Sequence, residues 1–81
     1  MKLQDTIELM NSSNFKDRFK AEYYQLKIRH EGLVRMLKKY KEGTLEFKPN
    51  CSYDLLRTQL FYMEGYMSVL EEGAEIENIE L

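Results

Sequence analysis

Apolar residues recur along most of this chain at steps of three and four positions, the repeat of an amphipathic α-helix. The longest such stripe lies between residues 14 and 42 and has no interruption. Its members are Phe19, Tyr23, Leu26, His30, Leu33, Leu37 and Tyr40. Asn14 is a suitable N-cap, and Gly43 fits the left-handed position that ends a helix. The pattern therefore predicts a long helix over residues 14–42.

A second long helix is predicted over residues 53–72, with Ser52 as its N-cap. It carries two apolar stripes, roughly 100° apart around the helix. One consists of Leu56, Leu60, Met63, Met67, Leu70 and Ala74, and the other of Leu55, Gln59, Tyr62, Tyr66 and Val69. A single neighbouring helix covers only one of them. The surplus stripe therefore predicts that copies of the chain associate.

The remaining segments are short. Residues 1–11 predict a short amphipathic helix, or a flexible arm, with Leu3, Ile7 and Met10 on one face. Residues 43–51 form the connector between the long helices, a tucked-in loop in which Phe47 is expected to cover the end of the hairpin.

Gly73 is expected to end the second helix, which leaves residues 73–81 as an acidic tail, docked or frayed. With 81 residues there is room for one small domain. The predicted fold class is all-α: a short N-terminal helix and a long antiparallel helical hairpin over residues 1–81. The hairpin is expected to assemble into a homo-oligomeric helical bundle.

Charge, cysteine content and hydropathy limit the classes of partner and the compartment that the sequence fits. Twelve Lys and Arg against fourteen Asp and Glu give a net charge of −2, which provides no general attraction to nucleic acid. Cys51 is the lone cysteine and fits a reducing compartment. No apolar run approaches the ~20 residues that cross a bilayer. We expect a cytoplasmic protein without membrane contact.

Catalytic patterns are missing from the sequence. No serine lies in a G-x-S-x-G turn, no glycine-rich loop fits a phosphate, and no compact set of metal ligands is present. His30 and Cys51 are separated by a helix end and the connector. We expect no enzyme activity, no cofactor and no metal site. His30 either hydrogen-bonds across the helix interface or contacts a ligand in an assembled pocket.

A polar line beside the long stripe is the candidate binding surface. It consists of Arg18, Glu22, Gln25, Arg29, Gly32 and Met36. Two guanidiniums around an amide suit a phosphate or the edge of a nucleobase. Tyr24, Tyr62 and Tyr66 could stack on the base. The same residues also fit an ordinary helix-surface network, and Tyr62 and Tyr66 fit a subunit interface.

One family resemblance rests on the segment FKDRFKAEYYQLKIRHEGLVRMLKKYKEGTLEFKPNCSYDLL, the Met63–Tyr66–Leu70 rhythm and the ending AEIENIEL. The chain resembles small proteins from phages and prophages of Gram-positive bacteria, related to an open reading frame of a crAss-like phage. The resemblance covers residues 13–81, and D-R-F-x-A-E-Y-x-Q-L is its most specific part. Gly73 departs from the family pattern, in which a longer, often basic side chain is expected.

The hairpin layout is also similar to phage sponge proteins of the anti-CBASS and anti-Thoeris type. Those proteins assemble, often as hexamers, and trap cyclic nucleotides or ADP-ribose derivatives between subunits. The resemblance implies that Arg18 and Arg29 meet phosphates, Gln25 a base or ribose, and one of the three tyrosines an adenine.

The predicted function is therefore sequestration, without cleavage, of a host nucleotide immune signal in the bacterial cytosol. The alternative is a protein–protein inhibitor or adaptor that docks through the face of Tyr62, Tyr66 and Val69.

Overall fold

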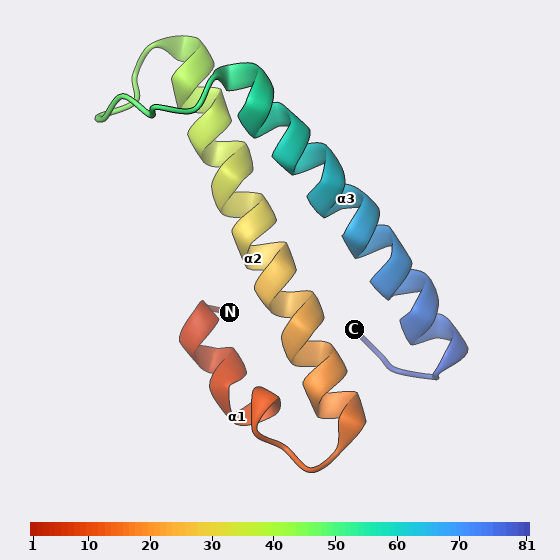
Figure 1. Cartoon of the computed structure of the whole chain (residues 1–81). Helices are drawn as coiled ribbons and strands as arrows, with labels where there is room; N and C mark the ends of the chain where they lie inside the picture. The colour runs from red at the N-terminus through yellow and green to blue at the C-terminus, as the bar shows by residue number, and fades with distance from the viewer.

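The chain folds into helices joined by short turns and loops, in a computed structural model that describes residues 1–81. The elements in order are a 3₁₀ turn η1 (Leu3–Thr6), α1 (Ile7–Met10), α2 (Phe15–Glu42) and α3 (Tyr53–Ile76). Figure 1 shows α2 and α3 side by side and antiparallel, with the N-terminal segment on the other side of α2. The all-α prediction is confirmed.

The ends of α2 are set by two local signals. At its start the Asn14 side chain accepts a hydrogen bond from the backbone N–H of Lys16, at 2.9 Å. At its end Gly43 has φ 75°, the left-handed conformation in which glycine is favoured. The backbone N–H of Thr44 then donates to the carbonyl of Lys39, at 2.9 Å. These contacts satisfy the terminal backbone groups that a helix leaves unpaired.

Helix α3 continues to Ile76, beyond the predicted end at Glu72. Gly73 lies inside the helix, and a Cβ there would lie 3.6 Å from the ring of Phe19 on α2. The small residue therefore brings α3 close to an aromatic side chain instead of ending the helix. The expectation that Gly73 ends α3 is wrong.

The C-terminal tail is docked. Asn78 turns the backbone with a φ of 57°, and the N–H of Ile79 donates to the carbonyl of Ala74, at 2.8 Å. The Ile79 side chain is buried. Of the two alternatives for the tail, the structure shows docking.

Gly73 also provides a test of this packing. Replacement by alanine should stabilise the chain by about 0.5–1 kcal/mol, because glycine in a helix interior is less favourable than alanine by that amount. The added methyl group would make an ordinary van der Waals contact with Phe19. Urea denaturation followed by circular dichroism measures the change. Destabilisation by Gly73→Ala would show that Phe19 lies closer to α3 than described.

Buried apolar residues run along the hairpin, with Ala21, Tyr23, Leu70, Ala74 and Ile79 away from the connector. A cluster of four buried leucines lies in the half near the connector: Leu33, Leu37, Leu56 and Leu60. Met36, Tyr40, Tyr53 and Met63 pack around them. Because the predicted stripe of α2 and the first stripe of α3 face each other here, the assignment of these two stripes to the helix interface is confirmed.

Two peripheral apolar groups are not buried, and for Phe47 this contradicts the prediction. Leu3, Ile7 and Met10 are exposed, and the residue that the N-terminal segment buries is Thr6. A polar side chain anchors this segment because hydrogen-bond partners lie beneath it, as described below. Phe47 is also exposed and does not cover the end of the hairpin.

Candidate functional site

Three polar contacts join α2 to α3 where the leucine core gives way to smaller and more polar side chains. The hydroxyl of Tyr23 donates to Oε2 of Glu71, at 2.6 Å. His30 Nε2 lies 3.2 Å from Oε2 of Glu64. The third contact is the hydroxyl of Tyr66, which donates to Glu22. Of the two alternatives for His30, the structure shows the contact across the helix interface.

These contacts change the acidity of two tyrosines. The hydrogen bond to Glu71, assisted by burial, raises the pKa of Tyr23 to about 12. The hydrogen bond to Glu22 likewise raises the pKa of Tyr66. A phenol that donates to a carboxylate keeps its proton, because ionisation would place two negative charges together. Both hydroxyls are therefore hydrogen-bond donors at neutral pH.

Two members of the predicted polar line hold the N-terminal segment. Gln25 Nε2 donates to Oγ1 of Thr6 at 3.0 Å, and Oγ1 of Thr6 donates to the carbonyl of Leu3 at 2.7 Å. Nη1 of Arg18 donates to the carbonyl of Ser12 at 2.7 Å. Sequence analysis missed this anchoring role. The available signal was a threonine between the apolar positions of a short helix.

The other predicted ligand residues lie on separate surfaces. Arg29 is exposed and makes no side-chain hydrogen bond or ion pair within the chain. Tyr24 faces the N-terminal segment and lines a hollow of about 160 Å³ with Met1 and Lys27. Tyr62 is exposed on α3, on the other side of the hairpin. One chain therefore does not place Tyr24 beside Tyr62 or Tyr66.

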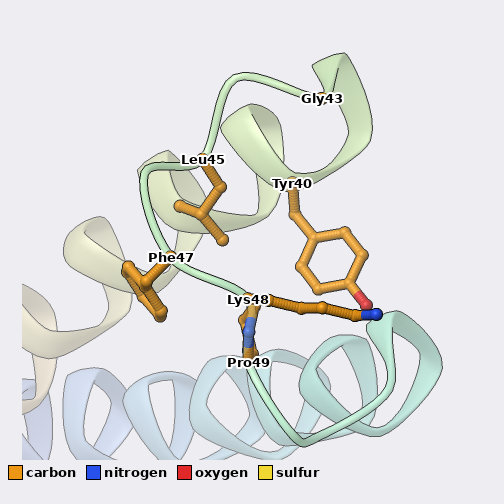
Figure 2. A pocket seen from close by; sticks show the side chains of 6 residues that line it. All are labelled: Tyr40, Gly43, Leu45, Phe47, Lys48 and Pro49. Atoms are coloured by element: carbon orange, nitrogen blue, oxygen red, sulfur yellow. The ribbon is translucent and has the colours of Figure 1, made fainter.

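A larger hollow, about 250 Å³, lies at the connector end of the hairpin. It is lined by Tyr40, Gly43, Leu45, Phe47, Lys48 and Pro49. Figure 2 shows the Lys48 side chain reaching toward the hydroxyl of Tyr40, with the leucine and phenylalanine side chains on the loop above. Sequence analysis did not predict this site, because the loop conformation that forms it is not encoded by a periodic pattern.

The exposed polar groups include the guanidinium of Arg29 and the phenol of Tyr62. Such groups can contact anions and aromatic rings by hydrogen bonding and stacking. No group of three His, Cys, Asp or Glu side chains is placed to hold a metal ion. No helix is long and apolar enough to cross a membrane.

The fold thus defines a small helical-hairpin protein with exposed aromatic and basic side chains. Residues 13–76 match the family model Sequestin, and the chain belongs to the Sequestin family. No curated protein and no solved structure matches the chain.

Proposed function

We propose that this Sequestin-family chain is a phage-encoded protein that sequesters a host nucleotide immune signal and does not cleave it. The family match over residues 13–76 carries the proposal, because the name of the family denotes sequestration of a ligand and implies binding instead of turnover. The likeness of the hairpin to anti-CBASS and anti-Thoeris sponges supports a cyclic oligonucleotide or an ADP-ribose derivative as the signal. The site of action would be the bacterial cytosol.

Arg29 is the residue we propose for phosphate recognition. Within one chain the guanidinium of Arg18 is engaged by Ser12 and the amide of Gln25 by Thr6, whereas Arg29 is free. A guanidinium forms two parallel hydrogen bonds with a phosphate, which fixes orientation as well as charge. Arg18 and Gln25 would then orient the ligand from the edge of the same helix face.

The aromatic part of the proposed site is one tyrosine. Tyr24 and Tyr62 lie on separate surfaces of the chain, so they do not face one ligand within a single copy, and one tyrosine would stack on each ligand. The exposed second stripe of α3 supports such a homo-oligomer, because it leaves several large apolar side chains in water. We therefore propose that ligand pockets form where copies meet.

A thermal-shift measurement tests the proposal against cyclic dinucleotides, cyclic trinucleotides and cyclic ADP-ribose isomers. A ligand at 100 times its Kd adds about 2.7 kcal/mol, which corresponds to roughly 10 °C or more for a domain of this size. Chromatography should then return the ligand intact. Absence of a shift with every compound would contradict a nucleotide ligand, and recovery of a cleaved product would contradict sequestration.

Two arginine variants sharpen the test. Arg29→Ala should weaken binding by about 10- to 100-fold, because a hydrogen bond to a charged group contributes roughly 1.5–3 kcal/mol. Arg35→Ala is the matched control, since Arg35 is also an exposed, unpaired arginine of α2. Isothermal titration calorimetry measures both. An equal loss of ligand affinity in the two variants would indicate a general electrostatic attraction. Arg29 would then have no specific role in the site.

The second candidate function is inhibition of a host or phage protein by docking. The observation in its favour is the exposed aromatic face of Tyr62 and Tyr66 with Val69, since such residues are enriched at protein interfaces. A pull-down distinguishes the two functions. One stoichiometric protein partner that persists after nuclease treatment, together with no nucleotide shift, would favour docking.

A further inference from the structure

The outer face of α3 carries an apolar heptad that the rest of the chain leaves uncovered. Its four members, seven residues apart, are Leu55, Tyr62, Val69 and Ile76, with exposed fractions of 57%, 69%, 67% and 74%. Its uncharged neighbours are Thr58, Gln59, Gly65 and Tyr66, and the exposed side chain of Glu72 lies between Val69 and Ile76 on the helix surface. Figure 1 shows no other element on this side of α3. Apolar residues repeated every seven positions favour contact with another helix.

We propose that this face binds the same face of a second copy of the chain, antiparallel and with two-fold symmetry. A two-fold contact uses one patch twice, so the patch must be complementary to itself. An axis between Gly65 and Tyr66 meets this requirement. It places Tyr62 level with Val69 of the second copy, and Tyr66 level with Gly65 of the second copy.

The same axis places Leu55 level with Ile76 of the second copy, which extends the contact to both ends of α3. At each level near the axis, a tyrosine ring of one copy then lies beside a smaller residue, valine or glycine, of the other. This is the arrangement by which packed helices fill the space between them without overlap.

Gly65 supplies an independent argument for a close neighbour. A Cβ at this position would meet no atom of the chain within 4 Å, so nothing inside the chain requires a glycine. Glycine in a helix interior is less stable than alanine, which makes its presence costly here. Gly73 differs, because Phe19 lies against it. A second helix that crosses α3 at Gly65 would use the space that the missing side chain leaves.

The charge that borders this face favours the antiparallel direction. In a parallel, in-register pair Glu72 would lie level with Glu72 of the second copy. The antiparallel pair places Glu72 level with Gln59 of the second copy, which is uncharged. Like charges brought together across an interface oppose that register, so the antiparallel pair is preferred.

The area of the face is comparable with that of a small interface. The exposed parts of the heptad residues and of Tyr66 amount to on the order of 600 Å² per copy, which, when fully covered, matches the lower end of the roughly 600–1,000 Å² per partner in standard interfaces. The proposal rests on the self-association in the proposed function, and it needs no nucleotide. It places Tyr62 and Tyr66 in the contact between copies, so Tyr24 is the tyrosine left to stack on a ligand. Its failure and the failure of nucleotide binding are therefore separable.

Cysteine cross-linking tests the register. In a Cys51→Ser background, chains with Tyr62→Cys and a size tag are mixed with chains carrying Val69→Cys and are oxidised. The antiparallel register predicts that disulfide-linked heterodimers form in excess and that each variant alone gives little dimer. Leu55→Cys with Ile76→Cys should behave in the same way. Homodimers of each variant, or a statistical mixture, would overturn the proposal.

Two glycine variants test the crossing point. Gly65→Leu should weaken self-association at least tenfold in sedimentation equilibrium and leave the melting of the dilute chain unchanged or raised. Gly32→Leu, on α2, is the matched control and should leave self-association intact, since an added Cβ there meets only the flexible end of Arg35. Equal association of Gly65→Leu and the unmodified chain would overturn the proposal. Intact cross-linking with no nucleotide binding would contradict only the proposed ligand.

Discussion

Replacement of Leu37 by alanine should destabilise the chain by about 2–5 kcal/mol, the usual cost of removing a buried leucine side chain and leaving a cavity. Leu37 is 3% exposed and belongs to the cluster of four leucines that joins α2 to α3. Small domains have stabilities of roughly 5–15 kcal/mol, so the loss is a large part of the total. This cluster is therefore a main apolar contact between the two helices.

The measurement is urea denaturation followed by circular dichroism at several protein concentrations, since association shifts apparent stability. Val34→Ala is the matched control, because Val34 lies on the same helix and is 42% exposed. It should change stability by less than about 0.5 kcal/mol, as surface substitutions usually do. A similar loss in both variants would mean that Leu37 is not in the core.

Removal of the Tyr23 side chain should have an effect of the same order. Tyr23→Ala should cost about 3–5 kcal/mol, the range for a large aromatic residue. Tyr23→Phe keeps the ring and loses the hydrogen bond to Glu71, so it should cost about 1 kcal/mol. The difference between the two variants separates ring packing from the polar contact. An unchanged free energy of unfolding in Tyr23→Ala would contradict the burial of this ring.

Tyr23 also makes stability depend on alkaline pH. Its pKa is about 12 in the folded chain and about 10 in an unfolded one. Because folding raises the pKa, the contribution is fully present below pH 10 and is lost as the pH rises through 12. Melting curves from pH 8 to pH 12 should show a steeper loss of stability above pH 10 for the unmodified chain than for Tyr23→Phe. Parallel curves would contradict this role.

The two long helices were predictable from the sequence because their stripes are continuous and their ends carry standard caps. Asn14, Gly43 and Ser52 each act as the pattern predicts. The end of α3 was not predictable. Glycine is a common helix stop, whereas Gly73 lies inside the helix with the ring of Phe19, distant in sequence, against it.

The candidate ligand site stays a prediction. Arg29 is exposed and unpaired within the chain, whereas Arg18 and Gln25 anchor the N-terminal segment. Spacing along a helix shows that residues share a face. It does not show that a short segment from elsewhere in the chain will lie on that face. Thr6, a single polar residue, makes that contact and interrupts no apolar pattern.

The central claim is that copies of this chain combine and that ligand sites form between them. Native mass spectrometry of the full-length protein at micromolar concentration tests it most directly. The account predicts an assembly with a mass that is a multiple of the 9.8 kDa chain, formed through the outer face of α3. A stable, well-folded monomer of 9.8 kDa as the only species would contradict it.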